Sequence, residues 1–137
     1  MTGGTDVSWS PPIDYFANVF LPQLFPFVEK AELQLLRRGY YPAGGGKVEL
    51  HIAPKFNLSQ CKTFQGFHHF LVEQPLAFHS LEQHHLMCIK GISHASADLE
   101  KAQVAERQAT GAKQALAGVS CPMQIRTEYS PTISTGS

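Results

Sequence analysis

The sequence contains no long hydrophobic run, few cysteines and no excess of either charge. A membrane-spanning helix needs roughly 18 or more consecutive apolar residues, and the 137-residue chain has no such run. Its opening residues, Met-Thr-Gly-Gly-Thr-Asp, carry neither the basic nor the apolar region of a signal peptide. Because 11 Lys and Arg balance 11 Asp and Glu, nucleic-acid binding would require a local site. We therefore expect a soluble, cytoplasmic protein without membrane contact.

The three cysteines, Cys61, Cys88 and Cys121, are odd in number and far apart. This arrangement is unlike a disulfide framework or a zinc finger and predicts reduced thiols. The sequence also lacks the GxGxxG and GxxxxGK[ST] fingerprints of nucleotide-binding loops. No nucleotide site can be assigned from these patterns.

Five of the seven histidines fall in a stretch without periodicity: His68, His69, His79, His84 and His85. Their spacing fits neither HExxH nor a Cys/His finger, so we interpret them as surface or loop residues. Ser93 and His94 have the composition of a nucleophile and its base, but adjacent residues rarely share the necessary geometry. We interpret that pair as the entry to a helix. From these motifs we assign no metal ligand and no catalytic residue.

A glycine-rich loop lies between two predicted strands and is the most distinctive segment. Apolar residues alternate around 31–38 and 47–53, which predicts a pair of strands. The loop is about seven residues long, more than a tight hairpin needs. It contains Gly44, Gly45 and Gly46, which permit positive φ or a close approach of the backbone to a ligand.

Three cations flank this loop: Arg37 and Arg38 at its entry and Lys47 at its exit. Cationic side chains beside bare backbone amides suit phosphate, so we predict phosphate or RNA contacts for these three residues. A surface turn beside solvated charges is the alternative interpretation.

Two helices are predicted from periodicity. Apolar residues from Ile13 to Leu24 follow helical spacing after Pro11-Pro12, with Ser10 as the expected N-cap and a distortion at Pro22. The second helix runs from Leu99 to a stop at Gly118 and has a stripe of alanines, which predicts close packing on a sheet.

The remaining predicted strands are 86–89, 123–129 and a short one within 67–72, the last inside an irregular stretch, 54–85. The order of helices and strands predicts an α/β (α+β) fold, divided near residues 75–85.

Three blocks stand out when they are taken together and in order. They are Gly3-Gly4-Thr5-Asp6 with Ser10-Pro11-Pro12-Ile13-Asp14-Tyr15, then Arg37-Arg38-Gly39-Tyr40-Tyr41-Pro42-Ala43-Gly44-Gly45-Gly46-Lys47-Val48, then Ile89-Lys90-Gly91-Ile92-Ser93-His94 with Ala105-Glu106-Arg107-Gln108. These blocks resemble the RNA 3'-terminal phosphate cyclase family.

The resemblance implies a fold of repeated βαβαββ units with a smaller α/β insert domain. Residues 1–80 would belong to the cyclase domain and residues 81–137 to the insert, so the chain would be a fragment of such an enzyme. The family is a ligase-like group of RNA-processing enzymes. It uses ATP and a divalent metal, Mg²⁺ or Mn²⁺, to turn an RNA 3'-phosphate into a 2',3'-cyclic phosphate.

In this family a histidine attacks ATP and passes the adenylate to the RNA phosphate, which the neighbouring 2'-hydroxyl then attacks. The resemblance places that histidine beyond the end of this chain, and none of the seven histidines here matches it. We therefore expect the chain to be inactive by itself. Pro11 and Tyr15 match positions that wall the adenine pocket, while Arg37, Arg38 and Lys47 lie in a family block without an assigned phosphate.

Two alternatives remain open. A eukaryotic branch of the family shares its fold but acts in ribosome assembly without catalysis, which would make this protein a binding factor. An unrelated α/β domain with a coincidental glycine loop is the other alternative.

Overall fold

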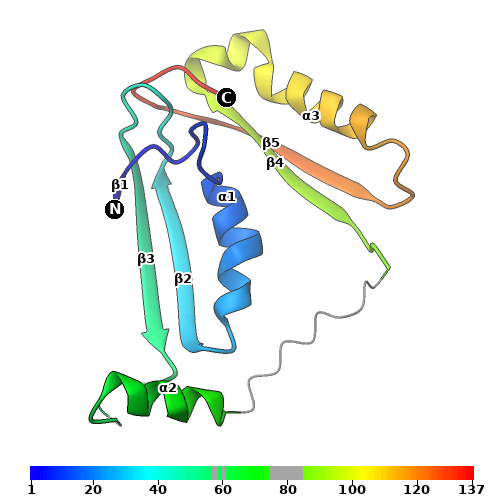
Figure 1. Cartoon of the computed structure of the whole chain (residues 1–137). Coiled ribbons are helices and arrows are strands. Elements are labelled where there is room, and N and C mark those ends of the chain that lie inside the picture. The colour runs from blue at the N-terminus through cyan, green and yellow to red at the C-terminus, as the bar shows by residue number, and fades with distance from the viewer. Residues whose placement is uncertain (57–58, 60, 75–84) are drawn as a thin grey trace.

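The structure is a computed structural model that describes residues 1–56, 59, 61–74 and 85–137. It contains two sheets (Figure 1): an antiparallel sheet in the order β1-β3-β2 and a parallel pair, β4-β5. The strands are β1 (Thr2–Gly3), β2 (Val28–Arg37), β3 (Gly46–Pro54), β4 (Ile89–Ser96) and β5 (Met123–Ser130). This combination of helices and sheets is the α/β fold expected from the sequence.

Strands β2 and β3 form the predicted hairpin around the glycine-rich loop. Leu33 pairs with Leu50 and Leu35 with Val48, so apolar residues share one face of the hairpin. Arg37 lies opposite Lys47 at the base of the loop. The hairpin therefore brings two of the predicted phosphate contacts side by side.

The segment from Ile13 to Leu24 is helical but changes its winding twice. It begins as α1 (Ile13–Tyr15), widens into a π-helix (Phe16–Phe20) and tightens into a 3₁₀ turn (Leu21–Leu24). Pro22 lies in the tightened turn, as expected for a residue that cannot donate a backbone hydrogen bond.

The prediction that Ser10 caps this helix is wrong, because Pro12 occupies the N-cap position. The first helical amide, that of Ile13, instead donates to the carbonyl oxygen of Thr5 at 3.0 Å. A backbone group of the preceding loop thus takes the place of a capping side chain.

The second sheet carries its own helix. A 3₁₀ segment (Ala97–Ala102) and α3 (Val104–Ala115) connect β4 to β5, and α3 lies across the pair. Ala105 and Ala109 on α3 are buried against the strands. The predicted alanine stripe and its close packing on a sheet are confirmed.

Two predicted strands are wrong. Residues 67–72 form part of a helix, α2 (Phe64–Val72), whose first turn is capped when the Gly66 amide donates to Thr63 Oγ1 at 3.1 Å. The strand predicted at 86–89 instead begins at Ile89 and continues to Ser96, which precedes the 3₁₀ segment. Ser93 and Ala95 of β4 are buried beneath α3, where there is room only for small side chains. Because these residues are small and only partly apolar, the sequence of β4 lacks the strong apolar alternation that would have predicted a strand.

In chain order, the first sheet precedes residues 75–84 and the second sheet follows them, and the sequence suggested a division near this point. His79 and His84, interpreted above as surface or loop residues, lie outside the described residues. The assignment of 1–80 and 81–137 to separate domains stays a prediction. Among the described residues, no helix combines the length and apolar character needed to cross a membrane.

The two sheets meet where the N-terminal loop, the glycine-rich loop and the C-terminal segment converge. The amide of Thr5 donates to the Gly39 carbonyl at 2.9 Å, and the Gly39 amide donates to Thr5 Oγ1 at 3.0 Å. From the other side, the amide of Ser96 at the end of β4 donates to the Gly136 carbonyl at 2.8 Å. This junction positions the residues of the candidate site.

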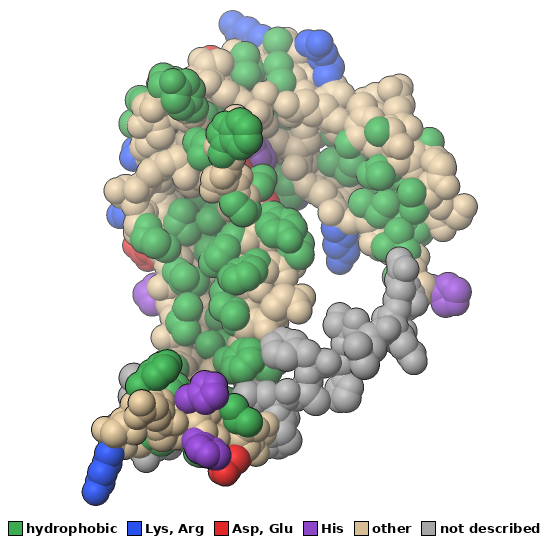
Figure 2. All heavy atoms as spheres, viewed as in Figure 1, with side chains coloured by type: hydrophobic (Ala, Val, Ile, Leu, Met, Phe, Trp, Pro, Cys, Tyr) green, Lys and Arg blue, Asp and Glu red, His purple; other side chains and the backbone are tan. Residues whose placement is uncertain are grey.

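Few apolar side chains are buried in the described part of the chain. They are Leu21, Tyr40, Val48, Ala95, Ala105 and Ala109. Figure 2 shows hydrophobic side chains reaching the surface over the first sheet and its helical segment, which exposes Val19, Phe20 and Phe25. With so small an apolar core, we expect the polar contacts at the junction to contribute to holding the two sheets together.

Candidate functional site

A buried cluster of charges occupies the junction, with Arg38 at its centre. The Arg38 side chain follows β2 and is only 2% exposed. Its Nη1 atom lies 3.2 Å from Asp6 Oδ2 and 2.8 Å from Asp14 Oδ2, and its Nε atom donates to Glu128 Oε1 at 2.9 Å. One guanidinium therefore joins three carboxylates from the N-terminal loop, α1 and β5.

His94 on β4 completes the cluster. Its Nδ1 atom is hydrogen-bonded to the Tyr40 hydroxyl at 2.7 Å, and its Nε2 atom lies 3.3 Å from Asp6 Oδ1 and 3.9 Å from Asp14 Oδ2. Ser93, the preceding residue, instead donates from Oγ to the Ala105 carbonyl at 2.7 Å. Neighbouring strand residues point to opposite faces, so Ser93 and His94 form no nucleophile–base pair. The prediction that they enter a helix is also wrong, since both lie within β4.

Protonation in the cluster follows from burial and its charges. Burial would raise the pKa of Asp6, but the adjacent His94 imidazole, a hydrogen bond from Thr5 and the charge of Arg38 hold that pKa below its usual value. Burial would lower the pKa of Arg38, yet Asp14 and Glu128 raise it overall. Burial is also the main cause that raises the pKa of Tyr40 to about 12. At neutral pH, Asp6 and Arg38 are charged and the Tyr40 hydroxyl keeps its proton.

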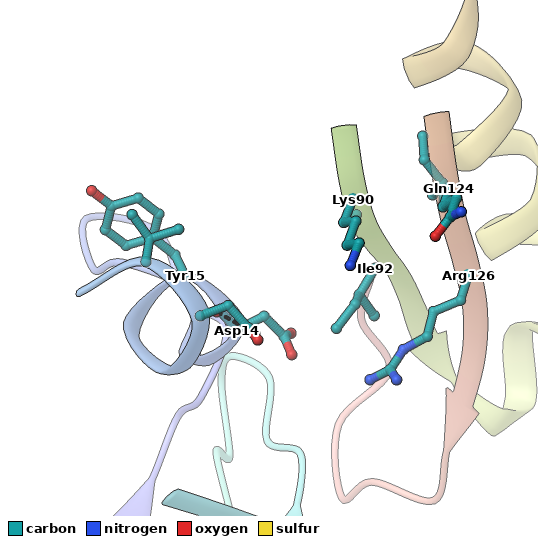
Figure 3. A pocket seen from close by; sticks show the side chains of 10 residues that line it. Asp14, Tyr15, Lys90, Ile92, Gln124 and Arg126 are labelled. Carbon is teal, nitrogen blue, oxygen red and sulfur yellow. Dashed lines mark hydrogen bonds between the residues drawn. The ribbon is translucent and has the colours of Figure 1, made fainter. Parts of the chain in front are cut away.

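A cleft of about 820 Å³ opens beside the cluster (Figure 3). One wall is the helical segment and the other is the pair of strands β4 and β5. The lining residues are Asp14, Tyr15, Asn18, Val19, Lys90, Gly91, Ile92, Gln124, Ile125 and Arg126. Figure 3 shows Lys90 and Arg126 on the strand wall, facing the wall that carries Asp14 and Tyr15. Asp14 belongs to both the cleft and the charge cluster.

The two residues predicted to wall an adenine pocket lie in different surroundings. Tyr15 lines the cleft and is 52% exposed, so its ring is available for contact. Pro11 is exposed but does not line the cleft. Their roles toward a nucleotide stay predictions.

The three residues predicted to contact phosphate also lie in different surroundings. Arg37 is exposed and donates from Nε to the Gly45 carbonyl at 2.6 Å, and Lys47 is exposed opposite it. The guanidinium of Arg38 faces the buried carboxylates and not the surface of the loop. A contact between phosphate or RNA and Arg37, Arg38 or Lys47 stays a prediction.

Sequence reasoning did not select most of the cluster. Asp6, Asp14, Tyr40 and His94 all lie within the three sequence blocks described above, so polar residues inside those blocks were the available signal. Glu128 lies outside the blocks, and no pattern around it indicated a partner 90 residues away.

Comparisons with known proteins agree with the family resemblance that those sequence blocks carry. A family model described as RNA 3'-terminal phosphate cyclase matches residues 1–125. Proteins named RNA 3'-terminal phosphate cyclase from Pyrococcus abyssi and Archaeoglobus fulgidus are 38% and 37% identical over 137 residues, which is 100% of this chain. One of the same name from Korarchaeum cryptofilum is 64% identical over 52 residues, 38% of this chain and 15% of that protein. The chain spans about a third of the length of the curated relatives it matches: 34% of the Pyrococcus abyssi protein and 35% of the Archaeoglobus fulgidus protein.

Proposed function

The chain belongs to the RNA 3'-terminal phosphate cyclase family, and we propose that it supplies part of an enzyme that uses ATP to convert RNA 3'-phosphate ends into 2',3'-cyclic phosphates. The observation that carries the proposal is the cleft between Tyr15 and the cations Lys90 and Arg126. We propose that this cleft binds ATP.

The chemistry of the cleft walls suits a nucleotide. An aromatic ring offers a face on which a base can stack, and Asn18 beside Tyr15 offers both a hydrogen-bond donor and an acceptor. Lys90 and Arg126 on the opposite wall suit the negative charges of the phosphates. The volume of about 820 Å³ lies within the range of small-molecule sites.

Adenylate transfer through a histidine is part of the proposal, but we propose that the nucleophile is none of the histidines in this chain. His94 is bonded to Tyr40 and lies against Asp6 and Asp14, and the described residues that line the cleft include no histidine. A divalent ion, which the family resemblance implies, would neutralise charge on the phosphates. The segment would then bind and orient the nucleotide without carrying the adenylate.

A non-catalytic relative that acts in ribosome assembly is the second candidate. One observation favours it: Arg38, a predicted phosphate contact, is ion-paired with Asp6, Asp14 and Glu128 and so does not present its guanidinium to a phosphate. Under this alternative the chain would keep the family fold and lack cyclase activity.

Replacing Tyr15 with alanine is expected to weaken binding of a fluorescent ATP analogue to the chain by about tenfold, since stacking of one base on an aromatic ring contributes on the order of 1–3 kcal/mol. The measurement is fluorescence anisotropy during titration, followed by denaturation in detergent at neutral pH, which leaves a histidine–adenylate bond intact. All of the label is expected to be released, because no covalent adenylate forms on this chain.

Tyr41→Ala is the matched control, since Tyr41 is an exposed tyrosine in the glycine-rich loop and does not line the cleft. Equal weakening by the two substitutions would contradict the assignment of the cleft. A stable protein-bound adenylate would contradict the assignment of the nucleophile to another part of the enzyme.

A further inference from the structure

Two buried carboxylate oxygens in the described part of the chain make no hydrogen bond, Asp6 Oδ1 and Asp14 Oδ2, although Asp14 Oδ2 is ion-paired with Arg38 Nη1 at 2.8 Å. Both face the same imidazole nitrogen, His94 Nε2, at 3.3 and 3.9 Å. The Asp6 side chain is 8% exposed, so water cannot readily satisfy its Oδ1 atom. Asp6 Oδ1 therefore has neither a hydrogen bond nor a guanidinium contact, and a cation bound beside His94 Nε2 would contact it.

We propose that Asp6, Asp14 and His94 bind one divalent transition-metal ion, Mn²⁺ or Zn²⁺. The proposal concerns the ion alone and holds whether or not the chain binds ATP or takes part in cyclisation.

The spacing of the three ligand atoms suits an ion. All three lie within 4.8 Å of one another. Ligand atoms that are each about 2.1 Å from an ion lie roughly 3.0–3.4 Å apart at tetrahedral or octahedral angles. The distance from His94 Nε2 to Asp6 Oδ1 is already 3.3 Å, and Asp14 Oδ2 is 3.9 Å from the same nitrogen. Small side-chain adjustments would complete the geometry.

The atoms behind the ligands orient them as in metal sites. His94 uses Nδ1 for the Tyr40 hydroxyl, so a neutral imidazole that donates there presents a lone pair at Nε2. Asp6 uses Oδ2 for Thr5 Oγ1 at 2.7 Å and for Arg38 Nη1 at 3.2 Å. Its Oδ1 atom is therefore left to face the proposed ion.

The charge balance of the cluster also favours a bound cation. Three carboxylates, those of Asp6, Asp14 and Glu128, surround the single guanidinium of Arg38. Glu128 also pairs with the exposed Arg126, whose Nη2 atom is 3.6 Å from Glu128 Oε2, so with a neutral imidazole one negative charge in the largely buried site is left without a partner. Buried charge that is not balanced is costly, and a bound cation would neutralise it while Arg38 keeps its contacts.

The donor set selects the type of ion. Mg²⁺ prefers oxygen ligands and retains its waters, whereas imidazole nitrogen combined with carboxylate oxygen suits Mn²⁺ and Zn²⁺. Asp14 is 24% exposed and also lines the cleft, so the ion would enter from that side. Its remaining coordination positions would face the cleft and hold water or an anionic ligand.

The test is a titration of the tag-free, chelator-treated chain with Mn²⁺, with no nucleotide or RNA present, in which electron paramagnetic resonance measures free Mn²⁺. We expect one ion per chain, displaced by Zn²⁺ and at least tenfold less readily by Mg²⁺. His94→Gln is expected to weaken binding by about 100-fold or more and Tyr40→Phe by about 10- to 100-fold, the range for residues that support a ligand.

His51→Gln is the matched control, because His51 also lies on a strand with its Nε2 atom 3.9 Å from a carboxylate oxygen, that of Glu49, but is exposed. Asp14→Asn provides a second variant if His94→Gln does not fold. Absence of saturable Mn²⁺ binding to the unmodified chain would overturn the proposal, and that result depends on no variant. Binding that survives both the His94 and Asp14 substitutions, or equal binding of Mg²⁺, would also overturn it.

Discussion

Replacing Arg38 with methionine is expected to lower the free energy of unfolding by about 3–5 kcal/mol, the range for removing one partner of a buried ion pair. The change leaves Asp6, Asp14 and Glu128 without the guanidinium that they share. Arg38 is 2% exposed, so water cannot take its place without opening the junction between the sheets. Equilibrium denaturation in urea, followed by circular dichroism, measures the change.

Arg37→Met is the control for this substitution. Arg37 is the preceding residue, is exposed and makes one hydrogen bond to the Gly45 carbonyl, so its loss is expected to cost about 1 kcal/mol or less. Arg38→Lys is expected to fall between the two, because lysine keeps the charge but cannot span three carboxylates. Equal effects of the Arg37 and Arg38 substitutions would show that the charge cluster does not hold the sheets together.

Replacing Gly39 with alanine is expected to destabilise the chain by about 3 kcal/mol, the upper end of the usual cost of overpacking. A Cβ atom at Gly39 would lie 2.2 Å from the Gly46 amide nitrogen and 2.5 Å from the Gly44 carbonyl oxygen. Both atoms are backbone, so the glycine-rich loop would have to move. The same loop position also holds Thr5 through hydrogen bonds in both directions.

Gly111→Ala provides the comparison on the same stability scale. Gly111 lies within α3, and a Cβ atom there would meet nothing within 4 Å. Alanine is expected to stabilise that helix by about 0.5–1 kcal/mol because it loses less backbone freedom on folding. If Gly39→Ala is as well tolerated as Gly111→Ala, the glycine-rich loop is not as tightly packed against itself as the structure shows.

Local patterns predicted the elements whose residues contact near neighbours in sequence. The β2–β3 hairpin follows from alternation on both sides of one loop, and the packing of α3 follows from alanines at helical spacing. The pattern failed at 67–72, where a helix forms, because a short apolar run does not distinguish helix from strand without its cap.

The charge cluster could not be predicted from local sequence patterns because its contacts join residues that are far apart in the sequence. Asp14 lies in the first turn of α1, yet its carboxylate lies against Arg38, 24 positions later. Arg38 and Glu128 are separated by 90 positions, and His94 and Tyr40 by 54. Only the fold brings these residues together, so composition and spacing gave no indication of their partners.

The glycine-rich loop has a clearer role once the fold is known. Gly39 lets the two sides of the loop approach each other, since a Cβ atom there would lie 2.2 Å from the Gly46 amide nitrogen, and Gly46 leaves room for the N-terminal loop, since a Cβ atom there would lie 2.6 Å from Thr5 Cγ2. A structural reason thus accounts for these two glycines without a phosphate. The phosphate prediction now concerns Arg37 and Lys47, which face each other at the base of the loop.

The most direct test of the proposed function is a chimera of the Pyrococcus abyssi relative in which this chain replaces the matching third. The chimera is incubated with ATP, Mn²⁺ and an RNA that ends in a 3'-phosphate, and the terminal phosphate is then tested for resistance to phosphatase. If the chain is a working part of a cyclase, ATP-dependent formation of a resistant 2',3'-cyclic end is expected. A folded chimera that binds ATP but forms no cyclic end would contradict that account and favour the non-catalytic relative.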